Sequence, residues 1–188
     1  MARRDASPPQ HTCRADLNWR ARVSAGRWDM NTDSSNNLPA RRRPVHPVIH
    51  ERGPHSVVIF MTVCTAERRS LLDNAAMHEL LRTSWSKAHH WLVGRYVIMP
   101  DHIHLFCAPG SNPPESLQSW VSYWKHLAAT SAGGSFWQKN FWDTQLRHHE
   151  SYDAKWDYVW NNPVRAGLVA RPEDWAYQGE LNMLRWHD

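Results

Sequence analysis

Four stretches of the chain have the apolar pattern of β-strands. A run rich in β-branched residues predicts a buried strand from residue 55 to about residue 66. Two more strands are predicted over residues 94–99 and 102–109, and the Pro100-Asp101 turn between them predicts a hairpin. Residues 141–147 can supply a fourth strand.

Three other stretches repeat apolar residues three and four positions apart, which predicts amphipathic helices. The first follows a cap at Asp73 or Asn74 and ends near residue 91. The second covers residues 113–132, and the third runs from about residue 151 to an Asn-Asn-Pro sequence that halts it. The apolar faces of the first two helices are Met77, Leu80, Leu81, Trp85 and Ala88, and then Leu117, Trp120, Val121, Trp124, Leu127 and Ala128.

The order of these elements predicts an α+β fold of the ferredoxin-like, split βαβ type. In that fold an antiparallel sheet carries two helices on one face and leaves the other face open. The third, C-terminal helix could cover part of the open face. We therefore expect a functional site there.

The N-terminal segment differs from the rest of the chain. Residues 1–44 lack sustained periodicity and are rich in Arg, Pro, Ser and Asn, so we expect a basic, mostly disordered arm before a folded domain over residues 45–188. Arg41, Arg42 and Arg43 could bind phosphates, or could equally form a solvated tail.

Composition excludes several classes of protein. A chain of 188 residues has no room for two full domains, and its longest apolar run of about seven residues is far below the ~18 needed to span a bilayer. No secretory signal follows Met1, so we expect a soluble, cytoplasmic protein with no membrane partner. Three cysteines without a C-x-x-C motif argue against a disulfide framework and a cysteine zinc site. The net charge of +4 is compatible with a polyanionic partner.

Two pairs of polar residues stand out as candidate chemistry. His102 and His104 alternate along a strand, so both imidazoles face the open side of the sheet and could bind a divalent ion. In a chain with 13 His, however, chance pairs are expected. On the third helix Tyr158 and Asn162, four residues apart, project from one face beside the core-facing stripe of Tyr152, Trp156 and Val159. By themselves they could also be a packing tyrosine and a helix-terminating asparagine.

The order of motifs along the chain, from about residue 42 to residue 175, resembles the REP-associated tyrosine transposases, a family of single-tyrosine HUH transposases. The motifs are Pro100-Asp101-His102-Ile103-His104, Trp137-Gln138, Phe141-Trp142-Asp143 with Arg147, and the segment from Trp156 to Val169 that includes Asn161-Asn162-Pro163.

The resemblance implies a role for each matching residue. His102, His104 and Asn162 would hold Mg²⁺ or Mn²⁺, and Tyr158 would be the nucleophile. The implied activity is cleavage and transfer of single-stranded DNA at palindromic hairpins through a 5′-phosphotyrosine. A nucleoid-associated monomer is expected by the same resemblance. A tyrosine often found after Trp-Gln in related proteins is absent here, since Phe141 and Trp142 occupy that stretch.

For DNA contacts we expect Arg147, Lys125 and Arg165 to bind phosphates, and Trp137 and Trp142 to stack on bases. Each cation could equally be a surface charge, and core packing is the alternative for the tryptophans. Two other functions keep the same fold: a domesticated palindrome-binding protein without cleavage, and a metal-dependent phosphoesterase that uses water. An RNA-binding module would explain neither the histidine pair nor Tyr158.

Overall fold

The computed structural model describes residues 57–111, 114–146 and 152–185, and all structural statements below refer to these. The predicted N-terminal arm, with Arg41, Arg42 and Arg43, and the predicted phosphate contact Arg147 lie outside them. The elements, in chain order, are β1 (Ile59–Cys64), α2 (Ala75–Lys87), β2 (Trp91–Ile98), β3 (His102–Pro109), α3 (Leu117–Ser131), β4 (Trp142–Gln145), α4 (Tyr152–Trp160), α5 (Asn162–Arg165) and β5 (Gln178–Glu180), with 3-10 turns at Ala66–Arg68 and Pro172–Asp174.

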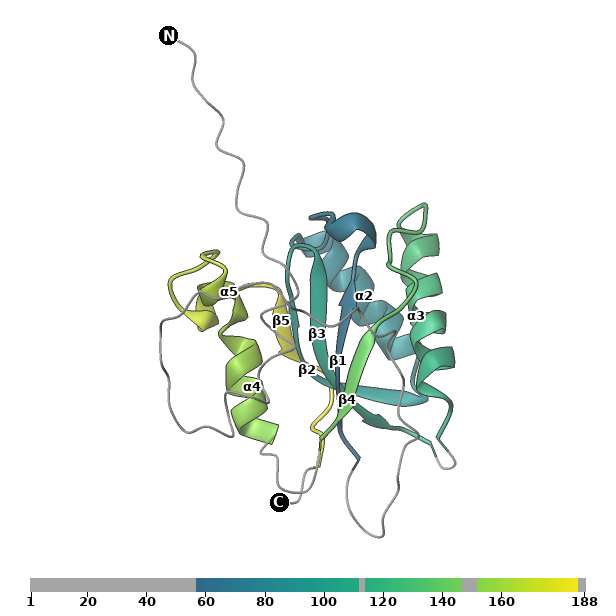
Figure 1. The fold of residues 1–188 in the computed structure, drawn as a ribbon. Helices are drawn as coiled ribbons and strands as arrows, with labels where there is room; N and C mark the ends of the chain where they lie inside the picture. Colours follow the sequence, from purple (N-terminus) through teal and green to yellow (C-terminus); the bar gives the residue numbers. More distant parts are fainter. Residues whose placement is uncertain (1–56, 112–113, 147–151, 186–188) are drawn as a thin grey trace, which may run out of the picture. The chain divides into compact units, whose positions relative to one another are not determined.

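The strands form one five-stranded antiparallel sheet with the order β4-β1-β3-β2-β5. Its first four strands, with α2 and α3, have the predicted split βαβ arrangement, so the predicted fold class is confirmed. Figure 1 shows α2 and α3 on one side of the sheet and α4 and α5 on the other. The strand β5 at the edge was not predicted, because three residues, Gln-Gly-Glu, carry no apolar alternation.

Tryptophans fill the core between the sheet and the helices α2 and α3. Trp85 and Trp124 pack edge to face with ring centroids 6.0 Å apart, and Trp124 meets Trp137 at 5.5 Å. These rings pack against Ile103 and Leu105, which point from β3 to this side of the sheet. Of the nine tryptophans among the described residues, five belong to this core: Trp85, Trp91, Trp120, Trp124 and Trp137.

A second, smaller apolar cluster lies on the opposite face of the sheet. Phe60 and Phe106 meet there at 5.2 Å, and Tyr152 and Val159 of α4 pack onto them. Trp175 joins the cluster and donates a hydrogen bond of 2.9 Å from its indole nitrogen to the Ile98 carbonyl oxygen. The helix α4 thus covers part of the face that the sequence left open.

Several predicted boundaries are wrong by a few residues. The first helix ends at Lys87, and β2 begins at Trp91 instead of residue 94, because the buried Trp91 belongs to the strand's inward face. The second helix begins at Leu117, where the Ser116 side chain accepts a hydrogen bond from the Ser119 amide. The fourth strand covers only Trp142–Gln145.

The Asn-Asn-Pro sequence ends α4 but does not end helical structure. The chain continues into α5, where Pro163 stands in the first turn. A proline is tolerated there because its missing N–H would have no partner within the helix. Asn162 is therefore the first residue of a new helix, and its side chain is buried.

Candidate active site

The two histidines of β3 meet on the α4 side of the sheet, as the strand alternation predicted. Their Nε2 atoms are 3.1 Å apart, and the rings are nearly perpendicular at 83°. Contrary to the expected open surface, both side chains are buried, and His104 is 0% exposed. The ring of Phe60 stacks on His104 at 5.6 Å and accounts for part of this burial.

The far nitrogen of each ring is held by an oxygen. Nδ1 of His104 lies 2.9 Å from the Thr62 hydroxyl, and Nδ1 of His102 lies 2.6 Å from an Asp101 carboxylate oxygen. Both Nε2 atoms can be ligands of one cation in the tautomer in which each Nδ1 carries the proton and donates to its oxygen; with a proton on one Nε2, the same contact is a hydrogen bond between the two rings. Two neighbouring ligands about 2.1 Å from one ion at a right angle stand about 3.0 Å apart, so the observed spacing fits a shared cation.

Asp101 is itself held by Arg68. The Arg68 Nε lies 2.7 Å from the second Asp101 oxygen, and its Nη1 donates to the Cys64 sulfur at 2.8 Å. Burial alone would raise the pKa of Asp101, but the hydrogen bond from His102 and the charges of His102 and Arg68 bring it below its ordinary value. The carboxylate is thus available as an acceptor for His102.

The loop that carries Arg68 has an unusual backbone. Glu67 and Arg68 have φ values of 55° and 58°, in the left-handed region that non-glycine residues rarely adopt. This conformation accompanies the contacts of Arg68 with Asp101 and Cys64. The sequence predicted only a polar loop here, because no local pattern predicts an arginine with a left-handed backbone conformation.

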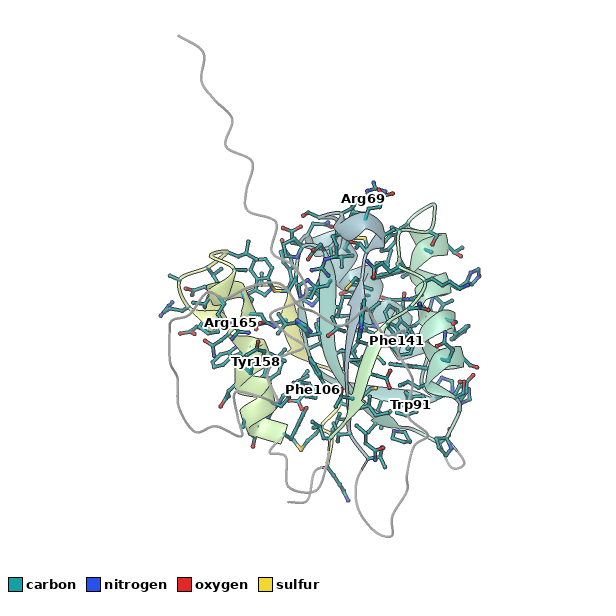
Figure 2. The ribbon with its side chains drawn as sticks, viewed as in Figure 1. Arg69, Trp91, Phe106, Phe141, Tyr158 and Arg165 are labelled. Atoms are coloured by element: carbon teal, nitrogen blue, oxygen red, sulfur yellow. The ribbon has the colours of Figure 1, made fainter. Side chains whose placement is uncertain are left out.

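The predicted nucleophile and amide lie close to a common cation. The Arg165 guanidinium carbon is 4.1 Å from the centroid of the half-buried Tyr158 ring, and Arg165 also donates a hydrogen bond to Asn162 Oδ1. Figure 2 shows Tyr158 and Arg165 together on the α4–α5 side of the sheet. Within the described residues, the buried Nδ2 of Asn162 has no hydrogen-bond partner. For Asn162 to ligate a cation through Oδ1, the ion would have to replace the guanidinium.

Lys155 lies between the histidine pair and Tyr158, on α4, the helix that carries this tyrosine (the tyrosine helix). Its Nζ lies 4.4 Å from the centroid of Phe60, the ring that stacks on His104, and 5.9 Å from the centroid of Tyr158. The sequence places this lysine one turn before Tyr158, but gave no sign of its burial, because a lysine on a short helix is normally exposed.

Two of the predicted DNA contacts are buried. Lys125 is 8% exposed and donates to the Gln138 carbonyl oxygen at 2.8 Å, and burial lowers its pKa to about 8. Trp137 packs between Phe136 and Trp124 in the main core. These positions favour packing roles for both, whereas Arg165 is exposed beside Tyr158 and Trp142 is half-buried on the edge strand β4.

Other expectations about the chain concern metals, thiols and membranes. In the part that the structure describes, no group of three or more His, Cys, Asp or Glu side chains is arranged to hold a metal. The predicted ligand set, His102, His104 and Asn162, is not such a group, because its third member is an amide. Cys64 and Cys107 are buried, and neither forms a disulfide with another described residue. None of the described helices combines the length and the apolar character needed to cross a membrane.

Comparisons with known proteins agree with the motif resemblance. No family model matches the chain. A REP-associated tyrosine transposase of Escherichia coli (strain K12) is 26% identical over 121 residues, which cover 63% of this chain and 73% of the relative. A Haemophilus influenzae protein that is provisionally given the same name is 27% identical over 99 residues, or 43% of this chain and 53% of the relative.

A solved structure supports the relationship at the level of the fold. It is the structure of a REP-associated tyrosine transposase bound to a REP hairpin, and it matches with a TM-score of 0.55 at 22% identity, over 76% of this chain and 82% of that one. The sequence match and the fold match name the same family. The chain is therefore similar to a REP-associated tyrosine transposase in sequence over 63% of its length, and to the structure of another in fold.

Proposed function

We propose that this protein is a transposase that cleaves and transfers single-stranded DNA at or near palindromic hairpins, with Tyr158 as the nucleophile and a divalent cation at His102, His104 and Asn162. The observation that carries the proposal is the convergence of the two histidine Nε2 atoms, 3.1 Å apart, with both Nδ1 atoms engaged by oxygens. With both Nδ1 protons donated to these oxygens, both Nε2 atoms would be ligands for one cation.

The proposed reaction transfers one phosphoryl group twice. The Tyr158 oxygen attacks the scissile phosphorus in line and forms a P–O bond, while the bond from phosphorus to the 3′ oxygen breaks. The phenol proton goes to solvent, and the leaving 3′ oxygen takes up a proton. The product is a 5′-phosphotyrosine and a free 3′-OH, which keeps the phosphodiester energy for rejoining by a second 3′-OH.

The residues of this chain divide the work of that reaction. Mg²⁺ or Mn²⁺, when bound, would polarise the phosphate as a Lewis acid. His102 and His104 would hold the ion through Nε2, and Asp101 and Thr62 keep their rings oriented. Arg165, exposed beside the Tyr158 ring, can pair with a phosphate oxygen once it leaves Asn162.

The proposed partner is a DNA hairpin with single-stranded flanks, as the motif resemblance implies. The related transposase of the solved structure is bound to a REP hairpin, which supports this choice. We further propose that the protein acts as a monomer at the nucleoid, since Tyr158 and the histidine pair lie on one face of one sheet.

Incubation of the full chain with end-labelled, single-stranded hairpin DNA and Mn²⁺ tests this proposal. A denaturing gel should show a covalent protein–DNA complex with wild type, and none with Tyr158→Phe or with excess chelator. Tyr152→Phe is the matched control, because that tyrosine packs against Phe106 and should leave the complex unchanged. Cleavage without an adduct would indicate water as the nucleophile, and hairpin binding without cleavage would indicate a DNA-binding relative that has lost the chemistry.

A further inference from the structure

A buried lysine on the tyrosine helix has surroundings that packing alone does not explain. Lys155 is 1% exposed, on the side of α4 that faces the sheet. Lys155 lies on the same face of α4 as Tyr152 and Val159, which pack in the second apolar cluster. A leucine or methionine would fill such a position without the free-energy cost of removing an ammonium group from water.

The contacts of Lys155 place its amino group between the two halves of the candidate site. The Nζ atom lies 4.4 Å from the centroid of Phe60, within the range of a cation–π contact. Phe60 stacks on His104, one of the candidate metal ligands. On the other side, the same Nζ is 5.9 Å from the centroid of the Tyr158 ring.

Two basic side chains contact the Tyr158 ring, one from α4 and one from α5. Lys155 lies on the same helix and Arg165 on α5, while His104 of β3 is reached through Phe60. Arg165 is exposed, so water and salt screen its charge. Lys155 is buried, so an ammonium charge at this position acts on nearby groups with much less screening.

We propose that Lys155 is a positioning residue whose buried positive charge stabilises the negative charge that develops on the Tyr158 oxygen during attack. The inference rests on the proposed nucleophilic role of Tyr158 and adds a residue that this role requires. The phenol must lose its proton to attack, and a fixed charge beside it favours the phenolate without reorganisation of solvent. The charge is costly in the resting protein and useful only during the reaction, as is common for groups in active sites.

The test compares Lys155→Met, Lys155→Arg and the control Lys139→Met, which removes an exposed lysine. Three quantities are measured on the full chain: the Tm, the hairpin Kd, and the single-turnover rate of the covalent adduct with hairpin DNA and Mn²⁺. For Lys155→Met we expect an unchanged or higher Tm, a Kd within about 3-fold of wild type, and an adduct rate at least about 100-fold lower. Lys155→Arg should recover about tenfold or more of that loss, and Lys139→Met should match wild type in all three.

The remaining outcomes overturn the inference in distinguishable ways. Adduct formation by Lys155→Met at the wild-type rate would remove the proposed role and leave that of Tyr158 intact. A Lys155→Met protein that fails to fold, or that loses Tm, DNA affinity and rate together without recovery by Lys155→Arg, would show that the lysine is structural. If wild type itself forms no adduct, the proposed function fails, and this inference fails with it.

Discussion

At the scale of single residues, the histidine pair is oriented by side chains that lie behind it. Strand alternation predicted that His102 and His104 share a side of the sheet, because successive strand residues point in opposite directions. Nothing in the sequence predicted Thr62 as the partner of His104, since that contact joins residues 42 apart on neighbouring strands. Arg68 was equally hidden, because its reach toward Asp101 accompanies a left-handed backbone.

Replacement of Asp101 by asparagine tests the importance of this support. The amide oxygen can still accept from His102 Nδ1–H, but it carries no charge and loses the ion pair with Arg68. We expect Mn²⁺ affinity, measured by calorimetric titration of the protein without DNA, to fall about 10- to 100-fold. Asp174→Asn, which removes an exposed partner of Arg171, is the control. Equal affinities in the two variants would show that Asp101 does not orient the ligand.

A second prediction at this scale concerns the buried Lys125. Burial lowers its pKa from 10.5 to about 8, so between these values the unfolded chain binds more protons than the folded one. Stability should therefore rise with pH across pH 8–10.5, by up to about 1.4 kcal/mol per pH unit from this group. Urea unfolding at several pH values should show a smaller slope in Lys125→Met. The same slope in both proteins would mean that Lys125 titrates normally.

At the scale of helices and strands, periodicity located every element of the split βαβ core but not all of the ends. Trp91 fits the apolar face of a helix and the inward face of a strand equally well, so pattern alone could not divide α2 from β2. The helix α5 was missed because Asn-Pro ordinarily ends a helix, and here it also begins one. The other errors in the predicted core elements concern boundaries, where local sequence competes with long-range packing.

The start of α2 offers a direct test, because the sequence left two residues as possible caps. In the structure Asn74 accepts a hydrogen bond from the Met77 amide at 3.0 Å. We expect Asn74→Ala to lower the free energy of unfolding by about 1 kcal/mol, and Asp73→Ala to change it by less than about 0.5 kcal/mol. Chemical denaturation of both variants measures the difference. A larger loss in Asp73→Ala would place the cap one residue earlier.

At the scale of the described fold, the sheet separates the tryptophan-rich core from the face that carries the candidate site. The tryptophan-rich core packs on the α2–α3 side, and the histidine pair, Phe60 and the tyrosine helix gather on the other. The fold class and the positions of His102, His104 and Tyr158 on one side of the sheet could be predicted from period and order. The buried Lys155 and the Arg68–Asp101 pair could not, because each depends on which elements meet in space.

This division predicts opposite effects for two adjacent residues of β3. Leu105 is fully buried on the core side, so Leu105→Ala should cost about 2–5 kcal/mol of unfolding free energy. At a temperature where that variant remains folded, its rate of adduct formation should stay within about 3-fold of wild type, because the site lies on the other face of the strand. His104→Ala should abolish the adduct and leave hairpin affinity within about tenfold, since phosphate contacts dominate that affinity. Calorimetric scans, gel-based adduct assays and hairpin titrations on the two proteins make the comparison. A large loss of adduct rate in folded Leu105→Ala would show that the two faces of the sheet are coupled, and that the chemistry depends on the exact packing beneath it.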